Sequence, residues 1–326
     1  MTVNKGDSTS ATGGEGAEAH EELRRFGYYT SNPNGTFDFR VFSKPADAAV
    51  LAELRTLVKV VFHLQPIVIA LEGVLRNRAD LIGFVGAYRA QLNAAATPHV
   101  RVEAALEGLI AATQRTTNLL SAATAFLAMT EAALRDAYGE SSAELVAWNT
   151  RRRELHAASF AYRFLYELRN FAQHRALPVS SFNIFGERPS EGLPMVFQPN
   201  VRLIRDALLV AGFDWGKLQA ELEQQPAQFD LLPLIDEYVA SLQALCLDVF
   251  MLEGARLAQC VLYMDAIKRT LQVPEGAIPV VFVGESASQH QPPGNVEIIP
   301  GEQLRWLIRR FDELMNFVRP PGPRTS

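Results

Sequence analysis

The chain has 326 residues, of which 48% are hydrophobic and 21% charged, so it can bury a large core in one or two domains. Its formal net charge of −5 argues against binding nucleic acid or anionic membranes over the whole surface, while leaving room for a local basic patch. On one helix, Cys246 and Cys260 would lie about 21 Å apart, too far for a disulfide, which indicates buried, reduced thiols.

Two short segments precede the main body of the chain. Residues 1–22 are rich in Gly, Ser, Thr, Ala and Glu, and burial cannot offset the entropy of ordering them, so we expect a disordered tail. Residues 23–43 alternate aromatic and polar side chains on either side of an Asn-Pro-Asn-Gly turn. This pattern predicts a β-hairpin arm.

Helical periodicity dominates residues 44–180. Pro66 is expected to kink or end the first helical segment, and residues 100–138 form one long helical pattern. Residues 155–177 are expected to form one further helix, which stops before Pro178. The predicted fold class is therefore all-α, a helical bundle with small β-hairpin appendages.

The second part of the chain, residues 181–318, is expected to be a helical extension with short strands, packed on the bundle. Its predicted elements are a hairpin at 182–185 and 195–197, a short helix at 214–223, a long helix at 229–271, strands at 278–283 and 296–299, and a helix at 302–317. Residues 319–326 form a proline-rich tail. Whether the two helical parts are one domain stays open.

The chain is expected to be cytoplasmic. Its most apolar run, residues 57–75, is interrupted by Lys59, His63 and Glu72, so no membrane-spanning segment is expected. The N-terminus has no basic region followed by an apolar run, so no secretory signal is expected. His63 is predicted to lie in the core.

Several kinds of site are not indicated. The sequence contains no phosphate loop, no Glu-x-x-His pair for a dinuclear metal site and no Cys or His pair at zinc spacing, so neither metal nor cofactor is expected. The tryptophans are expected to anchor packing rather than to stack on bases. They are Trp148, Trp215 and Trp306.

The helix at 155–177 ends in a distinctive polar segment. Its apolar residues fall on one stripe, with Arg169 at the edge and Asn170 and His174 roughly opposite. His174 is therefore expected to face solvent or a partner. It lies in the last turn, where the helix dipole favours a cationic imidazole.

The surroundings of this segment are basic. Residues 151–175 contain six arginines and two glutamates. Four of the arginines are candidates for binding an RNA backbone: Arg152, Arg153, Arg163 and Arg175. The alternative is a solvated surface on which the arginines pair with acidic neighbours.

The segment ELRNFAQHRALPV resembles the motif of the HEPN superfamily, in which an arginine, often followed by a polar residue, precedes a histidine by four to six positions. Here Arg169, Asn170 and His174 match that motif, and the resemblance covers about residues 100–180. It implies a small helical bundle that dimerises. Active members are metal-independent ribonucleases whose two motifs meet across the dimer interface.

These residue types suit RNA cleavage. His174 would act as general acid and base, Arg169 would bind the scissile phosphate, and Asn170 would position the imidazole from one turn away. Arg169 and His174 lie about 140° apart around a regular helix, so their convergence requires a distorted last turn or a second protomer. A homodimer acting on RNA in stress, defence or toxin-type control is expected. The partners considered are RNA and an antitoxin or another protein.

The resemblance has limits. One toxin branch has a tyrosine two positions after the histidine, whereas this chain has Ala176. The long C-terminal part is not present in the minimal family domain, and many members are regarded as non-catalytic. The alternative function is therefore a helical binding or assembly module whose motif is structural.

Overall fold

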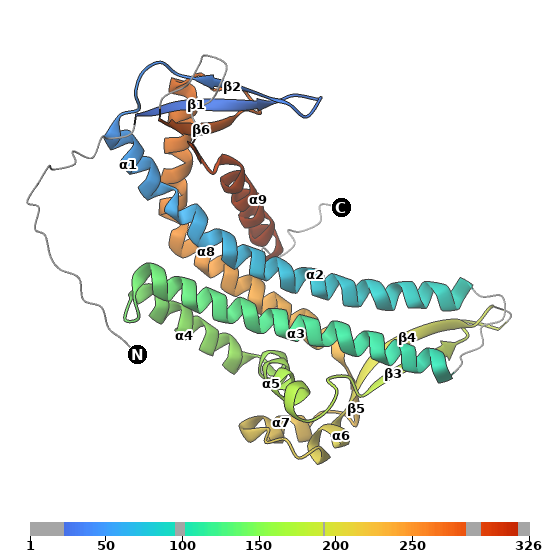
Figure 1. The fold of residues 1–326 in the computed structure, drawn as a ribbon. Helices are drawn as coiled ribbons and strands as arrows, with labels where there is room; N and C mark the ends of the chain where they lie inside the picture. Colours follow the sequence, from blue (N-terminus) through green and yellow to red (C-terminus); the bar gives the residue numbers. More distant parts are fainter. Residues whose placement is uncertain (1–22, 95–101, 192, 285–294, 319–326) are drawn as a thin grey trace, which may run out of the picture. The chain divides into compact units, whose positions relative to one another are not determined.

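The structure is a computed structural model that describes residues 23–94, 102–191, 193–284 and 295–318 (Figure 1). The predicted tails, 1–22 and 319–326, lie outside these residues. Contacts divide the chain into two compact units, Met1–Ala52 with Ile267–Ile299 and Glu53–Ala266 with Pro300–Ser326. Each unit thus combines segments that are far apart in sequence, whereas consecutive segments are expected from the sequence.

The smaller unit contains a four-stranded antiparallel sheet in the order β2-β1-β6-β7. Its strands are β1 (Arg24–Ser31), β2 (Phe37–Val41), β6 (Ile278–Val283) and β7 (Asn295–Ile298). The hairpin predicted at 23–43 is present as β1 and β2, and β6 pairs with the other edge of β1. A Cβ atom at Gly27 would lie 2.2 Å from the Arg40 carbonyl oxygen and 2.4 Å from the Phe282 ring, so this position requires glycine.

Helices make up most of the chain. They are α1 (Ala48–Leu57), α2 (Lys59–Ala94), α3 (Val102–Tyr138), α4 (Ala143–Ala158), α5 (Phe160–His174), α6 (Arg205–Val210), α7 (Gln219–Glu223), preceded by a short 3₁₀ turn η1 (Gly216–Leu218), α8 (Leu231–Thr270) and α9 (Gly301–Val318). The predicted long helix at 100–138 is confirmed as α3, and Gly139, with φ of +93°, ends it.

In the larger unit, α2 and α3 run antiparallel and α8 packs against both (Figure 1). The Tyr88 hydroxyl on α2 donates to the Ala104 carbonyl on α3, and the His63 ring meets the Tyr138 ring near the opposite ends of these helices. Pro66 does not end a helix, because α2 continues through it and the break between α1 and α2 falls at Val58. The core lies between these long helices and α5.

The larger unit also contains a three-stranded antiparallel sheet, β3-β4-β5. Its strands are β3 (Ser181–Glu187), β4 (Val196–Ile204) and β5 (Gln228–Asp230). The hairpin predicted around 182–197 is therefore confirmed. The sheet lies close to α3, because a Cβ atom at Gly108 would come within 2.4 Å of the Phe182 ring.

The fold class is mainly helical with two antiparallel sheets, so the all-α prediction is only partly confirmed. The β-rich elements are more than appendages, because one sheet joins strands from both ends of the chain. Trp148 and Trp215 are buried, as expected for packing anchors, whereas Trp306 is half-buried.

Among the described residues, one helical stretch, Ala48–Ala94, is long and apolar enough to cross a membrane by length and composition. A core helix of a globular protein passes the same test, and 44% of the most apolar window here is buried inside the fold. This stretch therefore gives no ground for assigning a location.

Candidate functional site

The helix predicted at 155–177 is two helices, α4 and α5, which meet at Ser159. The backbone of Ser159 is extended, its N–H donates to the Leu155 carbonyl at the end of α4, and its side chain accepts from the Tyr162 N–H at the start of α5. The Ser159 hydroxyl also donates to Glu237 on α8. A serine with N-cap geometry can interrupt a helical pattern without changing its apolar stripe, which is why periodicity missed the break.

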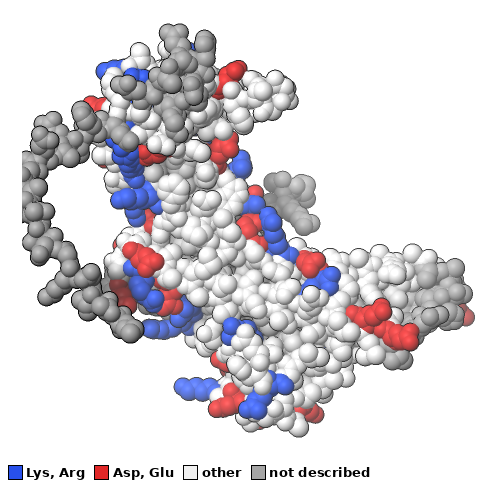
Figure 2. Space-filling view, viewed as in Figure 1, with Lys and Arg blue, Asp and Glu red and all other residues white. Residues whose placement is uncertain are grey.

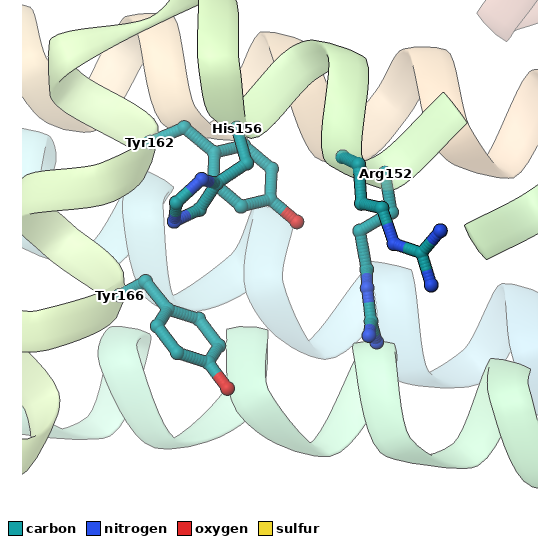
Figure 3. A pocket seen from close by; sticks show the side chains of 5 residues that line it. Arg152, His156, Tyr162 and Tyr166 are labelled. Carbon is teal, nitrogen blue, oxygen red and sulfur yellow. The ribbon is translucent and has the colours of Figure 1, made fainter. Parts of the chain in front are cut away.

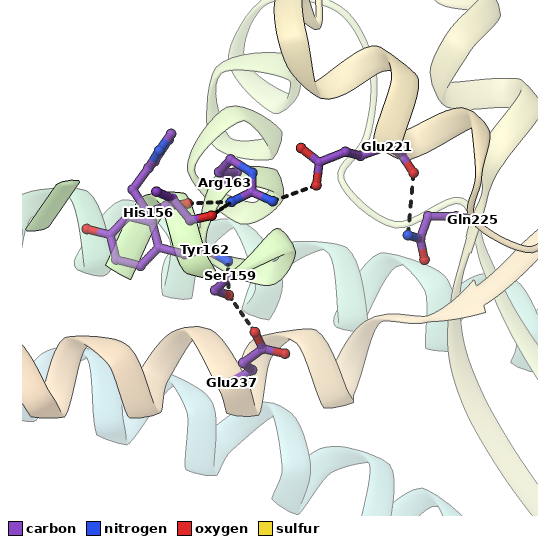
Figure 4. A network of polar contacts seen from close by, with 8 residues as sticks. His156, Ser159, Tyr162, Arg163, Glu221, Gln225 and Glu237 are labelled. Carbon is purple, nitrogen blue, oxygen red and sulfur yellow. Dashed lines mark hydrogen bonds and ion pairs between the residues drawn. The ribbon is translucent and has the colours of Figure 1, made fainter. Parts of the chain in front are cut away.

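Arg163 holds the bend between α4 and α5 in place (Figure 4). One guanidinium nitrogen donates to the carbonyl oxygens of His156 and Ala157, both at 2.6 Å, in the last turn of α4. The other nitrogen lies 2.5 Å from the Glu221 carboxylate on α7. These contacts bind the Arg163 side chain to the fold, so it is not free to bind RNA as predicted.

The motif residues lie at the C-terminal end of α5. The stripe predicted to face the core is buried, and Arg169 and Asn170 are half-buried beside it. His174 is exposed in the last turn, and α5 ends there, three residues before the predicted end, because the backbone of Arg175 leaves helical geometry. The His174 side chain makes no hydrogen bond or ion pair with any residue that the structure describes.

Asn170 is bonded to Arg169 rather than to His174. An Arg169 guanidinium N–H donates to the Asn170 side-chain oxygen at 3.2 Å, and the Asn170 amide donates to Glu167 at 3.1 Å. Asn170 thus orients Arg169 in this structure. Within one chain, no hydrogen bond joins the side chains of Arg169 and His174, both of which the structure describes.

The six arginines between residues 151 and 175 fall into two groups. Arg151, Arg152 and Arg163 form ion pairs with acidic residues. This agrees with the alternative prediction of a solvated surface on which the arginines pair with acidic neighbours. Among the described residues, the other three form no ion pair, and they are Arg153, Arg169 and Arg175. Figure 2 shows positive and negative side chains interspersed on the visible face.

A pocket of about 260 Å³ opens between α4 and α5. It is lined by Arg152, Arg153, His156, Tyr162 and Tyr166. Figure 3 shows the three rings on one side of the pocket and Arg152 across from them, with the Tyr162 hydroxyl directed toward Arg152. The His156 ring meets both tyrosine rings edge-on, with centroids 5.8 Å and 6.4 Å away.

The floor and rim of this pocket differ in polarity and exposure. Tyr162 is 1% exposed, and within the described part of the chain its hydroxyl has no hydrogen-bond partner, while burial raises its pKa. Burial, reinforced by Arg163, lowers the pKa of His156, so its imidazole is neutral at neutral pH. Tyr166 is 41% exposed. The pocket therefore combines two guanidinium groups, a buried hydroxyl donor and an accessible ring.

Three pocket residues, His156, Tyr162 and Tyr166, were not predicted from the sequence. One signal was available: Tyr162, Tyr166, Asn170 and His174 follow one another at intervals of four, which places them along one ridge of α5. The bend at Ser159, which brings His156 to this ridge, had no comparable signal.

A second polar cluster lies between α2, α3 and α8, around one buried carboxylate. The Glu253 carboxylate is 0% exposed, accepts a hydrogen bond from the Tyr138 hydroxyl, and lies 3.1 Å from an Arg256 nitrogen. His63 lies 3.3 Å from the same carboxylate, so it is in the core as predicted. Burial and the bond to Glu253 raise the pKa of Tyr138 to about 12.

This cluster predicts a pH dependence of stability. Burial lowers the pKa of His63 from 6.5, against the opposing effect of Glu253 and with the help of Arg256. As pH falls through about 6.5, the unfolded chain binds a proton at this histidine and the folded chain does not, so the free energy of unfolding is expected to decrease down to the lowered pKa. Urea unfolding between about pH 5 and about pH 8 measures this dependence.

The control for this prediction removes a second histidine whose pKa is lowered, among the residues that the structure describes. Burial also lowers the pKa of His156, so His156→Gln is used as the background for comparing His63 with His63→Gln. The His63→Gln protein is expected to show the flatter dependence. Equal slopes in the two proteins would contradict the prediction.

Among the described residues, no group of three or more His, Cys, Asp or Glu side chains is placed to hold a metal ion. Cys246 and Cys260 are unpaired and buried, and burial raises the pKa of both thiols. No protein family, no curated protein and no solved structure matches the chain. The HEPN resemblance thus rests on the motif residues of this sequence.

Proposed function

We propose that this chain is an HEPN-like, metal-independent endoribonuclease that acts as a homodimer, in stress, defence or toxin-type control of RNA. The observation that supports the proposal is the state of the motif at the end of α5. His174 is exposed there, and neither His174 nor Arg169 forms an ion pair with a carboxylate among the described residues. Both side chains are thus available to a phosphate.

The chemistry follows from these two groups. The 2′-hydroxyl of RNA can attack the adjacent phosphate when a base removes its proton and an acid protonates the leaving oxygen. His174 performs both proton transfers, because an imidazole can accept a proton at one nitrogen and donate one from the other, and histidine is the side chain most often used for this role. Arg169 stabilises the negative charge that builds up on the phosphate, and Asn170 orients Arg169.

The helix geometry supports a dimer. Arg169 and His174 lie about 140° apart around α5, and α5 is regular up to its last residue. In the proposal, Arg169 of one protomer therefore approaches His174 of the other. Arg153 and Arg175, both exposed and without ion pairs among the described residues, contact the RNA backbone on either side.

The test is cleavage of a labelled, structured RNA pool in EDTA. His174→Ala and Arg169→Ala are each expected to lower the rate about 100-fold or more, because they remove the proton transfer and the charge stabilisation. Gln173→Ala is the matched control for His174, since Gln173 is exposed in the same turn. Arg309→Ala, at an exposed position of α9, is the control for Arg169.

Light scattering establishes whether each variant remains dimeric, and circular dichroism establishes whether it remains folded. A dimeric wild type that cleaves no RNA, or a His174→Ala protein that cleaves at the wild-type rate, would overturn the proposal.

A second candidate function is a non-catalytic binding or assembly module. The observation that favours it is the chain of hydrogen bonds from Arg169 through Asn170 to Glu167, which gives the motif a role within α5 itself. In that case Arg169→Ala would destabilise the fold or the dimer, and wild type would show no EDTA-resistant cleavage.

A further inference from the structure

The pocket between α4 and α5 has the chemistry of a site for a doubly charged oxyanion. Arg152 and Arg153 contribute guanidinium groups from α4, and Tyr162 contributes a buried hydroxyl from α5. We propose that this pocket binds the terminal phosphate of an RNA strand, as a subsite of the proposed ribonuclease. The inference rests on the proposed function for its substrate, and on the pocket itself for the phosphate.

The Tyr162 hydroxyl is the strongest argument for a ligand. Leaving a buried hydroxyl without a hydrogen bond costs free energy, and proteins usually satisfy such groups. Here the residue is 99% buried, lines the pocket, and points toward Arg152, yet its hydroxyl has no partner among the residues described (Figure 3). A phosphate oxygen between Tyr162 and Arg152 would accept this hydrogen bond.

Three acidic residues near the pocket are each bonded to a neighbouring side chain. Glu131 accepts from Arg152 at 2.8 Å, Glu167 accepts from the Asn170 amide, and Glu221 pairs with Arg163. Arg153, by contrast, forms no ion pair in the part of the chain that the structure describes. The pocket therefore offers one unpaired guanidinium, one guanidinium with donors remaining, and one hydroxyl.

The shape of the pocket favours the end of a strand over its interior. Its volume of about 260 Å³ is below the usual range for sites that enclose a whole small molecule. Tyr162 is buried at one side of the pocket and Tyr166 is 41% exposed at another. A ligand would therefore place one terminal group beside Tyr162 and leave the rest of its chain near Tyr166. A monoester phosphate has three terminal oxygens for the three donors, whereas a phosphodiester has two and must continue outward at both ends.

The exposed ring and the ridge of α5 relate the pocket to the motif. A base next to the bound phosphate can stack on Tyr166, since every base presents a flat face to an aromatic side chain. Tyr166, Asn170 and His174 then follow at intervals of four, and His174 lies about 12 Å along the axis from Tyr166. An RNA end held in the pocket would thus extend toward His174.

The experiment measures binding in the absence of cleavage. The full-length protein is titrated with a short, fluorescent 2′-O-methyl oligoribonucleotide, which lacks the attacking hydroxyl, bearing a 5′-phosphate, a 3′-phosphate or neither. Inorganic phosphate is titrated as a separate arm. One phosphorylated form is expected to bind about tenfold more tightly than the unphosphorylated strand, as a charge-assisted hydrogen bond predicts, and the preferred end identifies the polarity of the bound strand.

Three variants locate the site. Tyr162→Phe and Arg153→Gln are each expected to remove most of the preference for the phosphorylated strand, while Arg309→Gln keeps it. Tyr162→Phe removes only a hydroxyl without a partner among the described residues, so its free energy of unfolding should equal or exceed that of wild type. Loss of the preference in a fully folded Tyr162→Phe protein therefore supports a ligand role.

Several results would overturn the inference. One is equal binding of phosphorylated and unphosphorylated strands. Another is a preference for the phosphorylated strand that persists in Tyr162→Phe and Arg153→Gln. The third is inorganic phosphate binding as tightly as the RNA end, which would indicate a site for a free phosphate. His174→Ala is expected to keep the preference. If phosphorylated ends bind and wild type cleaves no RNA, the subsite stands and the ribonuclease proposal fails; the reverse result removes only the subsite.

Discussion

Replacing Glu253 by alanine is expected to lower the free energy of unfolding by about 2–4 kcal/mol. The carboxylate is fully buried and is the common acceptor for the Tyr138 hydroxyl on α3 and the Arg256 guanidinium on α8. Alanine leaves both donors without this acceptor and also opens a cavity. The loss is therefore expected to exceed that of an ordinary surface ion pair several-fold.

Chemical denaturation measures this effect, with Glu253→Gln and Glu140→Ala as the comparison. Glutamine keeps an oxygen that can accept from Tyr138, so Glu253→Gln is expected to lose less, about 1–3 kcal/mol. Glu140 is 84% exposed, and its replacement is expected to change stability by less than about 0.5 kcal/mol. If Glu253→Ala unfolds like Glu140→Ala, the polar cluster around Glu253 does not hold α3 and α8 together.

The second large effect is expected at Trp215. Its indole stacks on Phe164 and Phe171 of α5, at centroid distances of 5.8 Å and 5.3 Å, and meets Phe213 edge-on at 4.8 Å. Its N–H donates to the Leu208 carbonyl of α6. Trp215→Ala is expected to lower the free energy of unfolding by about 3–5 kcal/mol, because it empties the centre of this aromatic cluster.

Trp306 is the matched control. It is half-buried on α9, so Trp306→Ala is expected to cost less than Trp215→Ala. Since the Trp215 cluster packs against the buried face of α5, its loss is also expected to disturb the motif on the opposite face. Trp215→Ala is therefore unsuitable for testing catalysis, and equal losses in the two variants would show that the cluster does not anchor α5.

Much of the local structure follows from the sequence. The hairpin at 23–43, the long helix α3, the hairpin of β3 and β4, and the exposed position of His174 all agree with periodicity and turn residues. The predicted ends of the helices agree less well with the structure. The break at Ser159 depends on hydrogen bonds to Tyr162 and to Glu237 on another helix, and the apolar pattern passes through it unchanged.

In the candidate site, too, some features could be predicted from the sequence and others could not. The motif and its orientation on α5 could be predicted, since they depend on angles around one helix. The partners of the arginines could not, because Asp248, Glu131 and Glu221 come from other elements. The pocket at the bend of α4 and α5 required the break at Ser159, which the sequence pattern did not indicate.

The sequence alone thus determined where most helices and strands lie and which face of α5 meets the core, because both depend on neighbours three or four positions away. Only the tertiary structure decided that β1 pairs with β6, that Glu253 is buried beside His63, and that Arg163 is engaged while Arg153 forms no ion pair with any described residue. These outcomes depend on which distant side chains the packing brings together. That information is absent from local periodicity, since one spacing of apolar residues is compatible with many arrangements of the charged ones.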